Sequence, residues 1–143
     1  GASSVHALDV GHGQLHPRIA ADKRVRNLEG LNAKDIPDDL IPPVDWIVSD
    51  VSFISLDKAL PVPLSIAKPG AVLVALIKPQ FEVGRGFVGR GGLVKDPELH
   101  RQVRANIAAF LTASGWRVTG EDDSPIIGGD GNREFLIAAQ KSA

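Results

Sequence analysis

Short apolar runs separated by polar, glycine-rich and proline-rich stretches make up most of the chain. Residues 5–10, 44–50 and 71–77 are the clearest runs, and Trp46, Ile47 and Val48 are apolar on successive positions. Strands that helices cover on both faces have this pattern. The pattern therefore predicts parallel strands buried between helices.

Helical spacing is strongest after residue 96, where Asp96 and Pro97 supply an N-cap and a first-turn proline and Gly115 ends the pattern. Two weaker helices are expected at residues 14–21 and 56–67, and prolines must kink the second. The remaining strands are expected at residues 25–29, 116–120 and 133–139. This order predicts an α/β fold with a mostly parallel, doubly wound sheet, and the two closing strands predict one antiparallel member.

The longest stretch without a usable period is residues 79–96, which is rich in glycine. Loops of this length inside a compact domain are usually functional or disordered. The stretch combines cations with aromatic side chains, namely Phe81, Arg85, Phe87, Arg90 and Lys95. We expect a long mobile loop that could bind an RNA backbone and stack on a base, with a solvated flexible linker as the alternative.

Composition limits the classes of protein. The 143 residues suit one domain, and 43% hydrophobic and 23% charged residues are typical of globular proteins. The lack of cysteine fits a cytoplasmic protein, and no apolar run approaches the roughly 20 residues of a membrane span, so we expect no membrane partner. With a net charge of −1 the chain as a whole is not basic, so any nucleic-acid binding must depend on local basic patches. Because the chain has no methionine, even at residue 1, we expect a fragment; its oligomeric state is not indicated.

Three ionisable residues fall at predicted strand ends: Asp50, Lys78 and Glu134. In open parallel sheets the carboxyl edge is the usual ligand site. If the strands are neighbours, these side chains meet there, and a neutral lysine could deprotonate a hydroxyl. Carboxylates favour the ammonium form, so that role needs a nearby positive charge. A structural ion pair is the alternative, and at Asp50 a helix cap or a turn is another.

A resemblance to a known family favours the catalytic interpretation. The segments DVGHGQLH, EGLNAKD, VSDVSFISL, LIKPQFE, VGRGGLVKDPELH and GNREFL resemble, in order and spacing, the methyltransferase domain of the TlyA (hemolysin A-like) family. These proteins belong with the FtsJ-type ribosomal RNA 2′-O-methyltransferases. The resemblance covers essentially the whole chain and implies a Rossmann-like fold that uses S-adenosyl-L-methionine to methylate ribosomal RNA, free or in a ribosomal subunit.

The resemblance also implies roles for individual residues. Asp50, Lys78 and Glu134 match the last three members of a Lys, Asp, Lys, Glu tetrad, with Lys78 as the base. Asp9 matches the acid that binds the cofactor ribose, Asn32 falls where the family contacts adenine, and Asp50 also lies close to the methionine moiety.

Family members have further segments before the position that matches residue 1: the first tetrad lysine, the first strand, a glycine-rich cofactor loop and usually an S4-type RNA-binding domain. On this interpretation residues 1–143 are a partial FtsJ-like domain. We therefore expect the chain alone to bind the cofactor weakly or not at all and to be inactive, which calorimetry can test.

Three other functions remain open. A membrane-acting hemolysin, as the family name suggests, would cause leakage from liposomes. A non-catalytic RNA-binding or nucleotide-binding domain would bind without turnover. A nucleotide-binding oxidoreductase would need a GxGxxG turn before Asp9 and leaves Lys78 and Glu134 without a role. A metal site is not indicated, because His12 and His16 have no third ligand at a suitable spacing.

Overall fold

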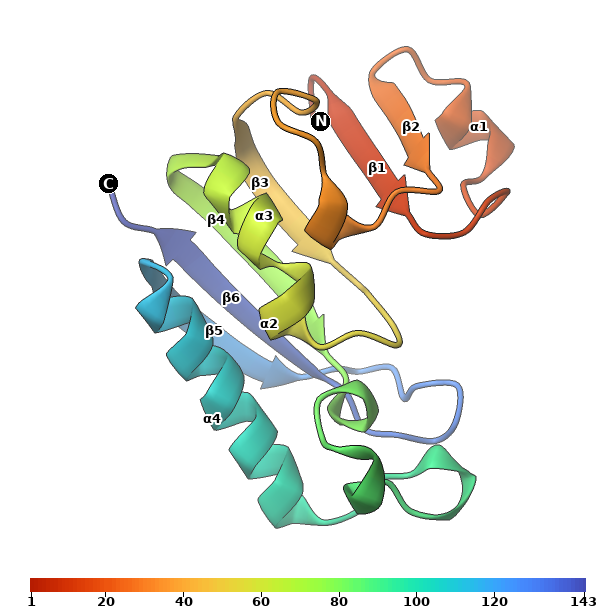
Figure 1. Ribbon diagram of the computed structural model, residues 1–143, viewed down its shortest axis with the longest axis vertical. Helices are drawn as coiled ribbons and strands as arrows, with labels where there is room; N and C mark the ends of the chain where they lie inside the picture. Colours follow the sequence, from red (N-terminus) through yellow and green to blue (C-terminus); the bar gives the residue numbers. More distant parts are fainter.

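The computed structural model describes residues 1–143, which form two sheets (Figure 1). In the two-stranded sheet, β1 (Val5–Asp9) and β2 (Val25–Glu29) are parallel and α1 (Pro17–Ala20) connects them. The four-stranded sheet has the order β3-β4-β6-β5. Its members are β3 (Val44–Ser49), β4 (Ala67–Ile77), β5 (Trp116–Asp123) and β6 (Phe135–Lys141).

The strand directions agree with the sequence prediction of a mostly parallel arrangement with one antiparallel strand. β3 and β4 are parallel, whereas β6 runs antiparallel to both β4 and β5. The carboxyl ends of β1 to β4 face the same edge of the molecule, and β6 begins at that edge (Figure 1). Residues that follow β3 and β4 and those that precede β6 are therefore brought to one place.

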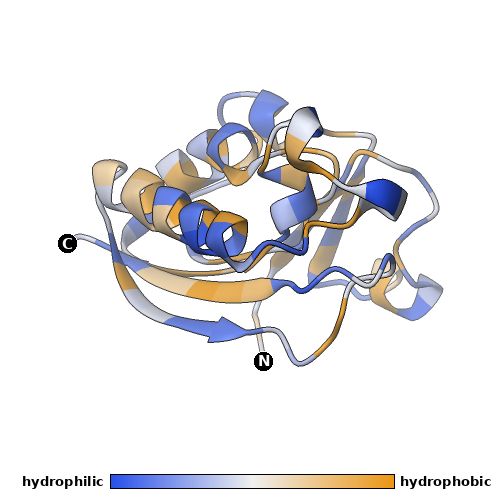
Figure 2. Ribbon diagram, turned by 90° about the horizontal axis from the view of Figure 1, so that it is seen from below, coloured by the Kyte–Doolittle hydropathy of each residue, from blue (hydrophilic) through white to orange (hydrophobic).

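The hydrophobic core lies between the four-stranded sheet and three helices, α2 (Leu56–Ala59), α3 (Pro61–Ile66) and α4 (Pro97–Ala113). All three cover the same face of the sheet (Figure 2). Burial alternates along β4 and β6, so that every second side chain points into the core. None of the helices is both long enough and apolar enough to cross a bilayer.

The expectation that helices cover both faces of β3 is wrong. Ile47 packs against the core, but the side chains of Trp46 and Val48 are 62% and 78% exposed. Because α2, α3 and α4 share one face, the opposite face of β3 has no helix above it (Figure 2).

Several element boundaries also differ from the prediction. β4 begins at Ala67 instead of residue 71, because Ala67 already pairs with Val44 across a register shift. The helix predicted for residues 56–67 divides into α2 and α3 at Leu60, immediately before a proline. Three short helical turns occupy the stretch predicted to be a loop: η2 (Pro79–Phe81), η3 (Arg85–Phe87) and η4 (Arg90–Gly92). Another such turn, η1 (Ala33–Asp35), follows β2.

Candidate active site

An ion pair between Lys78 and Asp50 lies at the carboxyl edge of the four-stranded sheet. The Lys78 Nζ lies 2.6 Å from Asp50 Oδ1 and donates a hydrogen bond to Ser52 Oγ at 3.1 Å. The Lys78 side chain is only 14% exposed, whereas that of Asp50 is 64% exposed. The amine is therefore enclosed and fixed, and the carboxylate opens to solvent.

The pairing of β3 with β4 produces this contact. Ser49 is the last residue of β3 and pairs with Ala75, so Asp50 leaves the sheet close to the end of β4 at Ile77. Lys78 follows with an extended backbone, φ −113° and ψ 96°. Parallel neighbours end at the same edge, so two residues 28 positions apart meet without any distortion of the strands.

Two further contacts join the segment after β3 to the segment after β4. The rings of Phe53 and Phe81 lie 4.8 Å apart between centroids at 49°. The Leu56 N–H, at the start of α2, donates to Glu82 Oε1 at 2.9 Å. Burial raises the pKa of the Glu82 carboxyl to about 7; the Leu56 N–H opposes the rise and the Asp57 charge adds to it. These contacts thus join the two segments beside Lys78.

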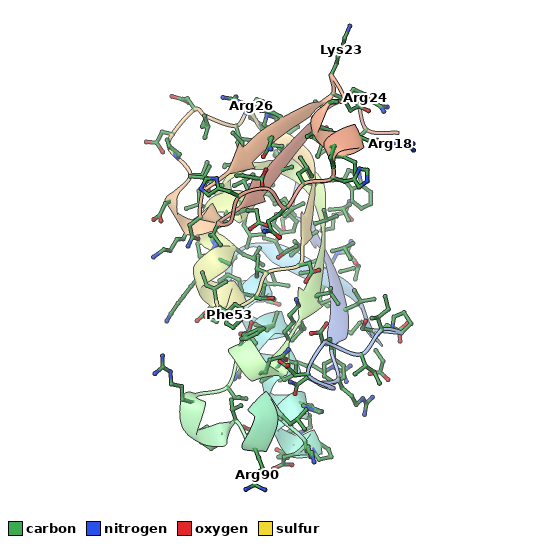
Figure 3. All side chains as sticks on the ribbon, turned by 90° about the vertical axis from the view of Figure 1, so that its right-hand side faces the viewer. Arg18, Lys23, Arg24, Arg26, Phe53 and Arg90 are labelled. Carbon is green, nitrogen blue, oxygen red and sulfur yellow. The ribbon has the colours of Figure 1, made fainter.

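Phe53 is the most exposed aromatic side chain at this edge. Its ring is 90% exposed, and its φ of +64° is a conformation that non-glycine residues rarely adopt. In Figure 3 the ring lies between Arg90 at one end of the molecule and Arg18, Lys23, Arg24 and Arg26 at the other. Strain of this kind, beside an enclosed lysine, is typical of a binding site.

Glu134 reaches the same edge but makes no ion pair with Lys78 within 4 Å. It directly precedes β6, and the pairing of Ile77 with Phe135 places it across from Lys78. Its carboxylate instead accepts a hydrogen bond from Gln80 Nε2 at 3.3 Å. The carboxylate also packs on Gly128, where a Cβ would lie 2.7 Å from Glu134 Oε2. The structure therefore places Lys78 and Asp50 in direct contact. Glu134 reaches the same edge of the sheet but contacts Gln80.

Two of the three predicted cofactor residues, Asp9 and Asn32, lie at the carboxyl end of the two-stranded sheet, whereas Asp50 follows β3. Asp9 ends β1, and its Oδ1 accepts the Gly11 N–H at 2.9 Å, while Oδ2 makes no hydrogen bond. Asn32 caps η1 by accepting the Lys34 N–H at 3.1 Å, and its Nδ2 is likewise unpaired. The two turns are tied together, since the Leu31 N–H donates to the carbonyl of Asp9 at 3.1 Å. An acceptor and a donor thus remain available for a nucleoside.

The carboxylate of Glu29 is an additional charge at this end of the sheet. It accepts hydrogen bonds from Asn27 Nδ2 and from the Gln14 N–H, each at 2.7 Å. These bonds, Asn27 first, lower the pKa of Glu29 and keep it ionised. Glu29 therefore fixes the segment that follows β1.

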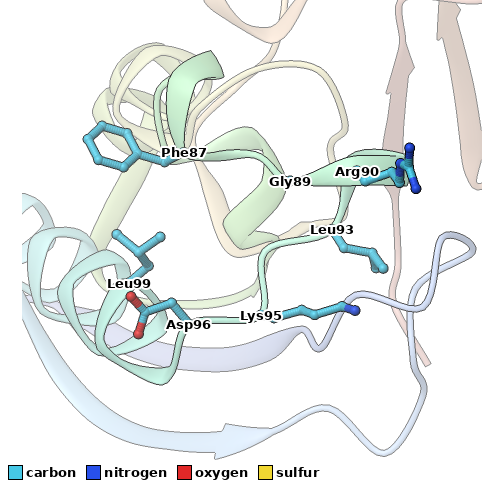
Figure 4. A pocket seen from close by; sticks show the side chains of 7 residues that line it. All are labelled: Phe87, Gly89, Arg90, Leu93, Lys95, Asp96 and Leu99. Carbon is cyan, nitrogen blue, oxygen red and sulfur yellow. The ribbon is translucent and has the colours of Figure 1, made fainter.

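The predicted RNA-binding residues are distributed along the loop between η2 and α4. Arg90 and Lys95 line a hollow of about 300 Å³, together with Phe87, Gly89, Leu93, Asp96 and Leu99 (Figure 4). Arg85 is exposed but does not line this hollow, and Phe81 is half-buried against Phe53. The exposed ring at this edge belongs to Phe53 and not to Phe81.

Sequence reasoning missed several residues of this edge. Ser52 and Phe53 lie two and three positions after Asp50, and Gln80 lies two positions after Lys78. Their proximity to the strand ends was a usable signal. Serine hydroxyls after a strand end do not by themselves indicate nucleophilic catalysis, which needs a histidine beside them.

Comparisons with known proteins agree with this architecture. The sequence profile of a family described as FtsJ-like methyltransferase matches residues 1–141. TlyA of Mycobacterium tuberculosis, a 16S/23S rRNA (cytidine-2′-O)-methyltransferase, is 43% identical over 138 residues, 96% of this chain and 52% of that protein. Hemolysin A of Brachyspira hyodysenteriae is 43% identical over 140 residues, 95% of this chain and 58% of that protein. The chain thus spans about half the length of these relatives.

Solved structures have the same fold. A Lactococcus lactis protein, named provisionally as a hemolysin, superposes with a TM-score of 0.93 at 41% identity, over 99% of this chain and 69% of that one. NodS, an N-methyltransferase from Bradyrhizobium japonicum solved with S-adenosyl-L-homocysteine, gives 0.66 at 12% identity, over 98% and 67%. The second likeness shows the fold alone. The predicted Rossmann-like methyltransferase fold and the TlyA resemblance are confirmed, and this chain belongs to the FtsJ-like methyltransferase family.

Proposed function

We propose that the full-length protein containing this chain transfers a methyl group from S-adenosyl-L-methionine to a ribose 2′-hydroxyl of ribosomal RNA, with Lys78 taking the hydroxyl proton. The observation that carries the proposal is the enclosed Lys78–Asp50 pair at the carboxyl edge of the sheet. The rRNA methyltransferase TlyA, 43% identical over almost the whole chain, supports the choice of substrate. Such a substrate would place the reaction with the ribosomes, in the cytoplasm.

The hydrogen bonds of Lys78 suit it to accept a proton. A neutral amine has two N–H groups and one lone pair. Asp50 Oδ1 and Ser52 Oγ can accept both N–H groups, at 2.6 and 3.1 Å. The lone pair is then the only part of the nitrogen that remains for a substrate hydroxyl, so these contacts orient the base.

The charges placed around Lys78 bear on its proposed role as the base. The negative charge of Asp50 lies 2.6 Å from Lys78 Nζ. S-adenosyl-L-methionine, when bound, supplies the methyl group and a positive sulfonium centre, which favours the neutral amine. Asp9 Oδ2 and Asn32 Nδ2 are unpaired and would hold the ribose and adenine of that cofactor.

In the proposed reaction the bound cofactor would supply its methyl group to the hydroxyl oxygen and would leave with the electron pair of the carbon–sulfur bond. The hydroxyl proton would move to Lys78 Nζ, which Asp50 and Ser52 orient. Glu134, held by Gln80, adds negative charge near the resulting ammonium. The products are a methyl ether, S-adenosyl-L-homocysteine and a protonated lysine, so charge and atoms balance.

The RNA would approach across Phe53 and the loop that follows η2. Phe53 is 90% exposed and supported by Phe81, so its face can stack on a base. Arg85, Arg90 and Lys95 would contact phosphates of the same strand. Phe81 then acts as the support of the stacking ring.

Single-turnover methylation of rRNA by the full-length protein tests the proposal. We expect Lys78→Ala to lower the rate by 10²-fold to 10⁴-fold, typical for loss of a general base, while RNA binding is retained. Lys68→Ala is the matched control, because Lys68 pairs with Asp45 at the opposite end of the same strand. A Lys78→Ala protein that methylates rRNA at the normal rate would refute the proposal.

A further inference from the structure

The side-chain amide of Asn132 is buried and bonded on both of its ends. Asn132 is 2% exposed, its Nδ2 donates to the carbonyl of Gly92 at 2.8 Å, and its Oδ1 accepts the Val94 N–H at 2.9 Å. A strand partner would bind the same two backbone groups in the same way. The amide therefore holds a segment that lies about 40 residues earlier in the chain.

His100 holds the same segment from the other side. It is 7% exposed, and its Nε2 hydrogen-bonds the carbonyl of Val94 at 2.7 Å. Its ring packs edge-on against Phe135, with centroids 5.4 Å apart. Both backbone groups of Val94 are thus bound by buried side chains, one on α4 and one just before β6.

The clamped segment carries the basic hollow. Leu93 lies between the two anchored residues, and its side chain lines the hollow with Arg90 and Lys95 (Figure 4). The turn before it is closed by the Gly89 N–H, which donates to the carbonyl of Leu93 at 2.7 Å. Asn132, unlike His100, also lies two residues before Glu134, the third predicted catalytic residue.

We propose that Asn132 and His100 are positioning residues for the RNA substrate: they hold residues 92–94 so that Arg90, Lys95 and the hollow keep one placement relative to Lys78 and Asp50. This inference rests on the proposed function and adds residues that touch neither RNA nor cofactor. A loop that must be ordered at each binding event loses affinity through the conformational entropy of its residues. Because the clamp orders residues 92–94 in the free protein, their conformational entropy is lost on folding and does not weaken RNA binding.

A matched pair of substitutions at His100 tests the proposal in the full-length protein. His100→Gln keeps an N–H that can reach the carbonyl of Val94, whereas His100→Leu packs on Phe135 without one. We expect His100→Leu to raise KM for rRNA about tenfold, because one backbone residue that was ordered in the free protein must then be ordered on binding. The kcat at saturating RNA and the affinity for S-adenosyl-L-methionine should stay within about twofold of wild type. His100→Gln should restore KM. Gln102→Leu, on the exposed part of the same helix, is the control.

A purely structural role predicts a different result. Both His100 variants would then lower the amount of folded protein, while the folded fraction keeps a normal KM. This result would overturn the proposal, and so would an equal rise in KM for rRNA in the two variants. If His100→Leu does not fold, amide hydrogen exchange measured on the wild-type protein tests whether residues 92–94 are held in place. The Val94 amide should exchange as slowly as the core of β4, and exchange as fast as that of exposed Gly86 would overturn the clamp.

Failure of the proposed function has a separate signature. If Lys78→Ala remains active, the assignment of the base fails, whatever the His100 variants do. If Lys78→Ala is inactive and His100→Leu has a normal KM, only the clamp is refuted.

Discussion

The carboxyl group of Glu82 makes the stability of the protein depend on pH in a predictable direction. Burial raises its pKa from 4.5 to about 7, even though the Leu56 N–H stabilises the ionised form. Between these values the folded state keeps the proton and the unfolded state has lost it. The free energy of unfolding should therefore fall as pH rises from 4.5 to 7 and then level off.

The substitution Glu82→Gln isolates this effect. Glutamine keeps an oxygen that accepts the Leu56 N–H but carries no charge at any pH. The rise in pKa from 4.5 to about 7 corresponds to roughly 3 kcal/mol. Because Glu82 is only half-buried, solvent screening reduces this to about 1–2 kcal/mol. The variant should gain that much over wild type between pH 4.5 and pH 8.

Urea unfolding at pH 4.5, 6 and 8, followed by the fluorescence of the buried Trp116, measures the difference. Asp45→Asn is the control, since Asp45 is exposed and pairs only with Lys68 at 3.4 Å. A Glu82→Gln protein whose stability relative to wild type is the same at all three values would show that burial of this carboxyl has no energetic consequence. Lower stability of the variant at pH 8 would also refute the reasoning.

Three other predictions concern the core, the position of Glu134 and the exposed ring. Leu73→Ala should lower the free energy of unfolding by about 3 kcal/mol in chemical denaturation, because Leu73 is 0% exposed; Val48→Ala, at a 78% exposed site, should change it little. Gly128→Ala should displace Glu134 and slow methyl transfer in a folded protein, whereas Gly129→Ala, which meets nothing within 4 Å, should not; equal rates would contradict this. Phe53→Ala should weaken RNA binding by about 1–3 kcal/mol in a filter-binding assay, and unchanged binding would exclude stacking.

The elements that periodicity defines were predictable from the sequence. The strand predicted at residues 25–29 has those bounds in the structure, and the Asp96 cap begins α4 by accepting the Glu98 N–H at 2.9 Å. Both depend on local signals, namely a short run that contains apolar residues and a short polar cap. The α/β class followed from the order of these elements.

Burial on the second face of β3 could not be predicted in this way. Successive apolar residues such as Trp46 and Val48 indicate only that both faces of a strand are apolar. Which face a helix covers depends on the tertiary path of α2, α3 and α4, and all three cover the face of Ile47. Local pattern carries no information on that choice.

Part of the candidate site was also predictable, because strand ends in a parallel sheet converge. The Lys78–Asp50 contact follows from adjacent strands alone. The attachment of Glu134 to Gln80, and the clamp of residues 92–94 by Asn132, depend on side-chain geometry across 38 to 54 positions of sequence. Such long-range hydrogen bonds become visible only when the backbone is in place.

The chemical identity of the methylated nucleoside tests the central proposal most directly. Ribosomal RNA treated with the full-length protein and S-adenosyl-L-methionine can be digested to nucleosides and analysed by mass spectrometry. We expect the added methyl group on a ribose 2′-oxygen, and we expect it to disappear with Lys78→Met, which keeps the length of the side chain and removes the amine. A methyl group on a base, or an unchanged yield of 2′-O-methylated nucleoside with Lys78→Met, would contradict a role for Lys78 and Asp50 in deprotonating the ribose.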